Sequence, residues 1–242
     1  MKLIEFKNVV KKFDDKTILD GISFSVNAGE TLAIVGFSGS GKSTALKIIS
    51  GLIEQDAGEV ILGDKNVGMV FQYSALFDSL NVFENVAFAL KERKDLKYLY
   101  TEEELKSIVS EKLKLVGLDE IEEKFPSELS GGMQKRVSFA RTIVTNPKII
   151  LYDEPTAGLD PISSTVIEDY IVHLKNEIKA ASIVVTHQMS TIQRTADNII
   201  MLYEGKIVWQ GSPREMLATD NPYAYQFVHS RREGPMLTAA GK

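Results

Sequence analysis

The stretch Gly36-Phe37-Ser38-Gly39-Ser40-Gly41-Lys42-Ser43 decides the fold. It matches the phosphate-loop pattern G-x-x-x-x-G-K-[ST], and it lies between an apolar strand predicted over Thr31–Val35 and a helix predicted over Thr44–Ser50. Glycines let such a loop curl so that its backbone N–H groups point at an anion, and the helix adds the positive end of its dipole. The loop predicts binding of a nucleoside triphosphate, but it does not indicate which process the hydrolysis of that nucleotide would drive.

The chemistry of the loop assigns roles to its last residues. Lys42 should reach the β- and γ-phosphates as a point charge, and the Ser43 hydroxyl should ligate Mg²⁺. We therefore expect ATP and Mg²⁺ as ligands. The residues expected to contact the nucleotide here are Gly36, Ser38, Gly39, Ser40, Gly41, Lys42, Ser43 and Thr44.

A second site is predicted where the apolar run Ile149–Tyr152 ends in two acids, Asp153 and Glu154. Two adjacent carboxylates at the end of a buried strand are costly without a cation nearby. Asp153 suits a direct or outer-shell hold on Mg²⁺. Glu154 lies one residue further and points differently, so it suits a general base for the attacking water.

The chain alternates strand and helix patterns, which predicts an α/β fold with a mostly parallel sheet. A change to helical texture with many Lys and Glu predicts a helical subdomain over 74–146, leaving 1–73 and 147–219 as the nucleotide-binding core with a β subdomain and 220–242 as a C-terminal tail. The tail is polar, so we expect it to be loosely held unless a partner covers it. Further strands are expected at Leu3–Val9, Lys16–Val26 (broken at Asp20-Gly21), Glu59–Leu62, Val67–Phe71, Ile183–Thr186 and the hairpin Asn198–Gln210.

Composition limits the classes of function. The net charge of −5 gives no global basic field for nucleic acid or anionic lipid, so no nucleic-acid partner is expected. The chain has no cysteine, which excludes disulfides and thiolate metal sites. No apolar run approaches the length of a membrane span. Contact with a membrane would therefore come through partners.

The segment Leu129-Ser130-Gly131-Gly132-Met133-Gln134-Lys135-Arg136 resembles the signature of the ATP-binding cassette (ABC) family, with Met133 where Gln is common. Ser130 is a good helix N-cap, and the two glycines leave N–H groups open to an anion. The resemblance implies a P-loop NTPase cassette with a RecA-like mixed sheet, an N-terminal antiparallel β subdomain and a helical signature subdomain. It also implies a head-to-tail homodimer, in which Ser130, Gly131 and Gly132 of one copy cover the γ-phosphate held by the other.

Four further positions resemble the family's in order and spacing. Gln72 matches the Q-loop glutamine, which implies contact with Mg²⁺ and the water and a link to transmembrane permease subunits. Asp160 matches the D-loop, and His187 matches the switch histidine near the γ-phosphate. Phe13 matches the aromatic residue that stacks on adenine. Gln188 departs from the family because an acid is commoner there, which leaves its D-loop contacts open.

The segments 72–86 and 220–235 resemble Mla-type ATPases, which serve phospholipid transport with MCE-domain partners. This resemblance implies a peripheral subunit on the cytoplasmic face of the inner membrane, bound to permease subunits and joined by an MCE-domain protein and a small cytoplasmic accessory subunit. The alternative is the ATPase of an importer for amino acids or other small solutes.

Two further alternatives come from outside transport. ABC ATPases of DNA repair or chromosome organisation carry long coiled coils between loop and signature, and translation factors hold two cassettes in one chain; neither pattern is present in this sequence. A non-hydrolysing regulatory cassette is disfavoured because Glu154 and His187 are both in place.

Overall fold

The computed structural model describes residues 1–236, and within them a central sheet has the strand order β5-β6-β7-β3-β8-β9. Neighbouring strands run parallel except for the antiparallel β8–β9 hairpin, so the predicted mixed sheet is confirmed. β6 and β7 are almost wholly buried because both faces of the sheet are covered, one by helices and the other by a helix and a second sheet. Its strands are β3 (Thr31–Gly36), β5 (Val67–Val70), β6 (Ile149–Asp153), β7 (Ala181–Val185), β8 (Asn198–Tyr203) and β9 (Lys206–Gly211).

A second, antiparallel sheet has the order β2-β1-β4, formed by β1 (Lys2–Phe13), β2 (Lys16–Asn27) and β4 (Ala57–Leu62). The predicted break at Asp20-Gly21 is wrong, because β2 continues through it. Gly21 takes a φ of 70°, and the pairing with β1 shifts register between Val9 and Lys11. The glycine therefore produces a bulge that bends one strand rather than ending it.

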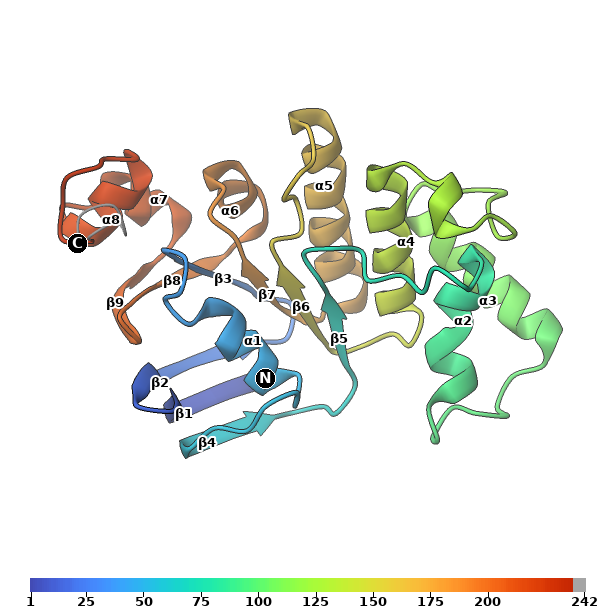
Figure 1. Ribbon diagram of the computed structural model, residues 1–242, viewed down its shortest axis with the longest axis horizontal. Coiled ribbons are helices and arrows are strands. Elements are labelled where there is room, and N and C mark those ends of the chain that lie inside the picture. The colour runs from blue at the N-terminus through green and yellow to red at the C-terminus, as the bar shows by residue number, and fades with distance from the viewer. Residues whose placement is uncertain (237–242) are drawn as a thin grey trace.

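Helix α1 (Lys42–Ile49) lies between the two sheets (Figure 1). Its buried side chains Ala45, Leu46, Ile48 and Ile49 join one apolar cluster with residues of β1, β2, β3, β6 and β7. The helix that follows the phosphate loop is thus fixed by packing on both sides. Its N-terminus is held rigidly at the end of β3.

Between β5 and β6 the chain forms α2 (Val82–Glu92), α3 (Glu102–Leu115), the short 3₁₀ helix η1 (Pro126–Glu128) and α4 (Gly131–Ile143). Capping boxes start α2 at Asn81 and α3 at Thr101, each with a Glu three residues later. These helices share a core with α5 (Pro161–Ile178) and with the β5–β6 edge of the sheet. In Figure 1 they form the end of the molecule opposite the C-terminal helices.

The last helices are α6 (Met189–Thr195), α7 (Pro213–Ala218) and α8 (Pro222–Val228). The expectation of a loosely held tail is wrong for residues 222–236. Ala224 and Met236 are fully buried, and Gln226 is 2% exposed. The Gln226 amide accepts from Met236 N at 2.8 Å and donates to Met236 O at 2.9 Å, so a side chain replaces the missing backbone partners. Residues 237–242 of the tail lie outside the described part.

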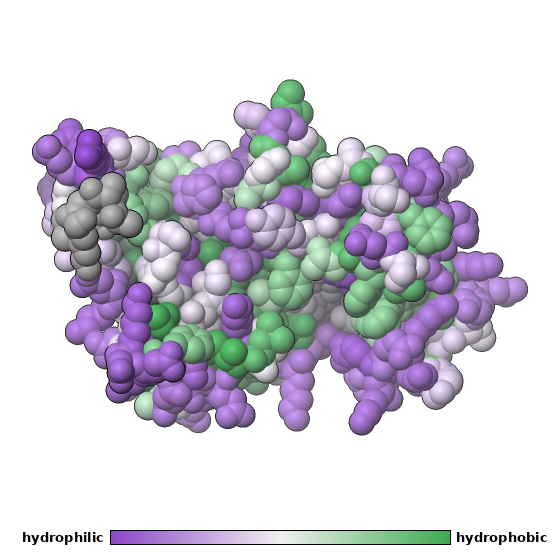
Figure 2. Space-filling view, in the orientation of Figure 1, coloured by the Kyte–Doolittle hydropathy of each residue, from purple (hydrophilic) through white to green (hydrophobic). Residues whose placement is uncertain are grey.

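Across residues 1–236, no helix is both long and apolar enough to cross a membrane. On the face seen in Figure 2, hydrophobic residues gather over the centre, and hydrophilic side chains project along much of the outline.

Candidate functional site

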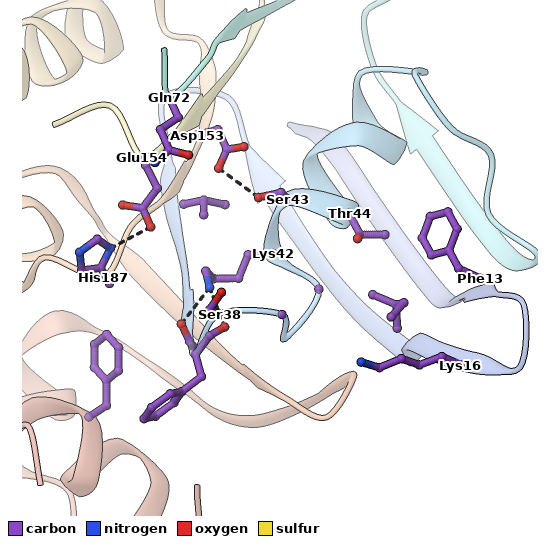
Figure 3. Close-up of a pocket in the computed structure, with 17 residues that line it drawn as sticks. Phe13, Lys16, Ser38, Lys42, Ser43, Thr44, Gln72, Asp153, Glu154 and His187 are labelled. Carbon is purple, nitrogen blue, oxygen red and sulfur yellow. Dashed lines mark hydrogen bonds and ion pairs between the residues drawn. The ribbon is translucent and has the colours of Figure 1, made fainter. Parts of the chain in front are cut away.

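A cleft of about 710 Å³ opens at the carboxyl ends of the parallel strands (Figure 3). β3 leads into the phosphate loop, β6 ends at Asp153, and Gln72 and His187 follow β5 and β7. This edge of an open α/β sheet is where ligands generally bind. Twelve of the predicted site residues line the cleft, namely Phe13, Gly36, Ser38, Gly39, Gly41, Lys42, Ser43, Thr44, Gln72, Asp153, Glu154 and His187.

The phosphate loop folds back over the start of α1. Gly41 takes a φ of 103°, and a Cβ there would lie 2.6 Å from a methyl of Leu19, so only glycine fits. The Lys42 ammonium donates to the carbonyls of Gly36 at 2.9 Å and Phe37 at 2.8 Å. Burial lowers the pKa of Lys42, while Glu154 and Asp153 oppose that shift. A partly buried cation therefore lies against the phosphate loop, where an anion would be well held.

Ser43 and Asp153 meet in the cleft although they lie 110 residues apart in the sequence. The Ser43 hydroxyl donates to Asp153 Oδ1 at 3.2 Å. Burial raises the pKa of Asp153, the adjacent Glu154 raises it further, and Ser43 and Lys42 lower it. The site thus concentrates carboxylate oxygens that a cation would stabilise.

Glu154 and His187 form the second pair. Glu154 Oε1 lies 2.9 Å from His187 Nδ1. Because an ionised carboxylate only accepts hydrogen bonds, Nδ1 carries the proton and Nε2 is left as an acceptor in the neutral ring. Glu154 Oε2 is buried and has no hydrogen-bond partner among the described residues. A buried acceptor of this kind is costly until a hydrogen-bond donor reaches it.

The other end of the cleft is aromatic. The Phe13 ring is 47% exposed, and the Lys11 ammonium lies 5.2 Å from its centroid. Figure 3 places Phe13 and Lys16 on the side of the cleft away from the acidic pair. An exposed ring beside cations suits stacking of a flat heterocycle.

Sequence reasoning missed five cleft residues: Lys16, Ile18, Phe37, Val185 and Phe227. Phe37 lay inside the quoted loop, and Val185 ends the strand before His187. Phe227 comes from α8 at the far end of the chain, and no local pattern around it points to a nucleotide site. Only the tertiary packing of α8 brings Phe227 to the cleft.

The remaining predicted site residues do not line the cleft. Ser40 is buried, with an unpaired hydroxyl. Ser130 caps α4 by accepting from Met133 N at 3.3 Å, and Gly131 is exposed beside it. Asp160 caps α5 by accepting from the N–H groups of Ile162 and Ser163. The structure therefore places the signature segment and Asp160 outside the lining of this cleft.

Known protein families and sequences were compared with this chain. A family model described as "ABC transporter" matches residues 19–157, which is more than half of the chain. TRIGALACTOSYLDIACYLGLYCEROL 3, a chloroplastic protein of Arabidopsis thaliana, is 46% identical over 97% of this chain and 75% of its own length. The mkl ATP-binding protein of Mycobacterium leprae, named for ribonucleotide transport, is 38% identical over 96% and 70%. The sulfate/thiosulfate import ATP-binding protein CysA of Xylella fastidiosa is 37% identical over 93% and 68%.

Solved structures agree with the fold. The cbiO1 protein of Clostridium perfringens, described as part of an ABC transporter complex, superposes with a TM-score of 0.81 at 29% identity and covers 91% of this chain and 92% of its own. A dimeric ATP-binding cassette bound to ADP and Pi after hydrolysis gives 0.78 at 32% identity, covering 88% and 99%. With its phosphate loop, paired acids and signature helix, the chain belongs to the ABC transporter family as an ATP-binding subunit.

Proposed function

We propose that the chain hydrolyses Mg²⁺-bound ATP in a homodimer and that this reaction drives lipid transport through a membrane-spanning partner. One observation carries the catalytic part. A single cleft brings together the cation of Lys42, the Ser43–Asp153 pair and the Glu154–His187 pair. Phosphoryl transfer needs these three functions: a charge on the phosphates, a metal site and a means of activating water.

The donor set fits Mg²⁺. Ser43, Asp153 and Gln72 supply oxygen atoms, and the raised pKa of Asp153 reflects a carboxylate that a cation would stabilise. Within residues 1–236 no group of three or more His, Cys, Asp or Glu could hold a metal by itself. Mg²⁺ commonly takes one or two carboxylates and fills the rest of its shell with water and substrate phosphates. When bound, the ion neutralises charge that develops on the phosphate oxygens.

The chain's own groups then have separate tasks. Lys42 exchanges the carbonyls of Gly36 and Phe37 for phosphate oxygens. The carboxylate of Glu154 takes the proton of the attacking water, while Nδ1–H of His187 donates to Oε1. The His187 side chain is 64% exposed. Phe13 stacks against the adenine.

We infer that the signature segment acts on the partner's nucleotide. Ser130 and Gly131 are exposed and do not line the cleft, and the first N–H groups of a helix have no partner within the helix. Two similar solved cassettes are dimers, which supports this arrangement. The helical subdomain 74–146 would carry the signature, and Asp160 would approach the same interface. The core would comprise 1–73 and 147–219, with 220–242 as the tail.

An exposed aromatic patch beside Gln72 supports a membrane partner. Phe71, Tyr73, Phe77 and Phe88 are 38%, 79%, 43% and 38% exposed. The Phe77 and Phe88 rings lie 4.7 Å apart, and Arg141 of α4 donates to the carbonyl of Ala75 inside the same segment. Exposed apolar patches mark interaction sites. A permease segment seated there would connect the cleft, through Gln72, to the membrane.

The lipid cargo rests on resemblance. The plant relative bears the name of a galactose-bearing diacylglycerol lipid, and segment 72–86 resembles Mla-type ATPases. The subunit would then sit on the cytoplasmic face of the inner membrane, with an MCE-domain protein and a small accessory subunit as further partners. The similarity to CysA supports a rival, an importer of a small solute. Copurification decides between them: a permease with an MCE-domain protein and lipid supports the first, and a periplasmic solute-binding protein supports the second.

The catalytic proposal is tested by ATP turnover of the wild-type chain and of Glu154→Gln, each with Mg²⁺ and with EDTA. Loss of the base should lower kcat roughly 10²- to 10⁴-fold, and EDTA should abolish wild-type turnover. ATP should still bind to Glu154→Gln. Wild-type turnover by that variant would exclude Glu154 as the base, and full turnover in EDTA would exclude the metal.

A further inference from the structure

The turn that carries Glu154 has an unusual backbone. Glu154 takes a φ of 47°, in the left-handed region that non-glycine residues rarely adopt. Its N–H donates to Val185 O at 2.9 Å, and its carbonyl accepts from Ala157 N at 3.1 Å. A strained residue of this kind persists only where its surroundings hold it firmly. The residues after Glu154 should therefore be fixed from more than one side.

The first hold comes from the signature helix α4. The Lys135 ammonium donates to the carbonyl of Pro155 at 3.2 Å and also to the carbonyl of Ala157. One cation thus ties together two carbonyls on either side of Thr156. Charge-assisted bonds of this kind are stronger than neutral ones, so the turn is anchored to α4.

The second hold comes from the opposite side, through the hydroxyl of Thr156. Thr156 is fully buried, and its single hydroxyl proton faces two acceptors: Gln188 Oε1 at 3.2 Å and Thr191 Oγ1 at 3.2 Å. Gln188 directly follows His187, so this contact joins the turn that carries Glu154 to the segment that carries His187.

A buried carboxylate ends the chain of hydroxyls. Thr191 Oγ1 donates to Glu168 Oε1 at 2.7 Å, and Glu168 is 2% exposed. Arg194 Nε lies 3.1 Å from Glu168 Oε2, which supplies the opposite charge that a buried carboxylate needs. Because the carboxylate only accepts, Thr191 must give its proton to Glu168 and can only accept from Thr156. Glu168 therefore fixes the direction of the hydroxyl chain.

We propose that Glu168 is a positioning residue for ATP hydrolysis. Glu168 acts through Thr191 and Thr156, while Lys135 holds the same turn from the other side. Together they keep the Glu154 backbone in its left-handed conformation and its carboxylate beside His187. The inference rests on the proposed role of Glu154 as the base. Neither Thr191 nor Glu168 lines the nucleotide cleft. Their loss should therefore lower the catalytic rate without weakening nucleotide binding.

The test compares Thr191→Val with Thr191→Ser in the 242-residue chain. Valine keeps the shape and removes the hydroxyl, so kcat should fall roughly 10- to 100-fold, as expected for a misplaced catalytic group. The KM and Kd for ATP should stay within about twofold. Serine restores the hydroxyl and should recover most of the rate. Thr195→Val is the matched control, because Thr195 is buried one turn later in α6 and, among residues 1–236, its hydroxyl bonds only the carbonyl of Thr191.

Glu168→Gln is a second variant of unchanged size, for use if Thr191→Val fails to fold. Its carbonyl would face Arg194 and its NH₂ would face Thr191, which reverses the hydroxyl chain, so the same selective fall in kcat is expected. If a folded Thr191→Val or Glu168→Gln keeps wild-type kcat while Glu154→Gln is inactive, the positioning proposal is wrong. If Glu154→Gln itself is fully active, the assignment of the base fails instead.

Discussion

Lys42 shows how a single side chain can be prepared for its ligand. Its ammonium is largely withdrawn from water, and the backbone carbonyls of Gly36 and Phe37 supply its described hydrogen bonds. Neutral carbonyls only partly replace the hydration that burial removes. A triphosphate would offer full negative charge at the same position, so binding is favoured by both the cation and the loop N–H groups.

Lys42→Ala should therefore weaken ATP binding. Losing charge-assisted hydrogen bonds of about 1.5–3 kcal/mol corresponds to a Kd that is roughly 10- to 100-fold higher. Isothermal titration with ATP measures the change. Lys47→Ala is the matched control, because Lys47 lies exposed in the same helix and does not line the cleft. Equal affinity of the two variants would contradict the role given to Lys42.

Asp153 adds a pH dependence. Because burial raises its pKa, its carboxylate takes up a proton at a higher pH than an exposed aspartate does. Metal binding needs the ionised form, so Mg²⁺ affinity should fall as the pH drops through that raised pKa, and Mg²⁺ binding should release a proton. Titrating Mg²⁺ into the ATP-bound chain over a pH series measures both effects. Asp153→Asn should weaken binding on the order of 10-fold or more and remove the dependence.

Residue-scale chemistry was predictable where local sequence carries it. The loop glycines, Lys42 and the two acids after an apolar strand each have a short pattern with a physical reason. The Thr156–Thr191–Glu168 chain has none, because three separate elements meet only after folding. Phe227 is similar, since its place in the cleft depends on how α8 packs.

At the scale of elements, α8 shows how a polar tail becomes part of the core. Asn221 caps the helix, Ala224 packs inward, and Gln226 bonds both backbone groups of Met236. These contacts turn the segment after α8 back onto the apolar cluster that also holds Phe37 of the phosphate loop. Composition alone predicted a loose segment, because it counts polar residues and does not see that one glutamine satisfies a buried peptide group.

Gln226→Ala should lower the free energy of unfolding by about 1–3 kcal/mol, since it leaves the buried N–H and C=O of Met236 without partners. Urea denaturation followed by circular dichroism measures the change. Gln193→Ala serves as the control, because Gln193 is exposed in α6. A loss no larger than that of the control would show that Gln226 does not hold the tail.

Secondary structure was largely predictable, and the errors have physical causes. The strand–loop–helix around Lys42 and the β8–β9 hairpin follow from apolar runs and turn residues. β2 was wrongly divided at Asp20-Gly21, because a glycine bulge and a chain break look alike in one dimension. The pairing of β2 with β1 distinguishes the two.

At the scale of the whole molecule, one chain holds an open nucleotide cleft and an outward-facing signature. Gly131 has no heavy atom within 4 Å of where a Cβ would lie, so a larger residue fits there without disturbing the chain's own fold. A substitution at Gly131 can therefore test whether the signature contributes to dimerisation separately from ATP binding by its own chain.

On the Glu154→Gln background, ATP should convert monomers to dimers, and adding Gly131→Asp should prevent this while leaving the Kd for ATP unchanged. A carboxylate at that position would repel the phosphates of the partner's nucleotide. Size-exclusion chromatography with light scattering reports the mass. Asn176→Asp adds the same charge at an exposed site on α5 and should leave dimerisation intact. Dimers that form despite Gly131→Asp would place the signature outside the interface.

The walls of the nucleotide cleft come from widely separated parts of the chain. Phe13 belongs to the first strand, whereas Phe227 belongs to α8. During synthesis, Phe13 therefore leaves the ribosome long before Phe227 does. Since domains generally begin to fold during synthesis and a ligand stabilises only the state that binds it, ATP can act as a folding ligand only late in translation. Until then the nascent core must rely on its own packing around α1, which the two sheets already enclose.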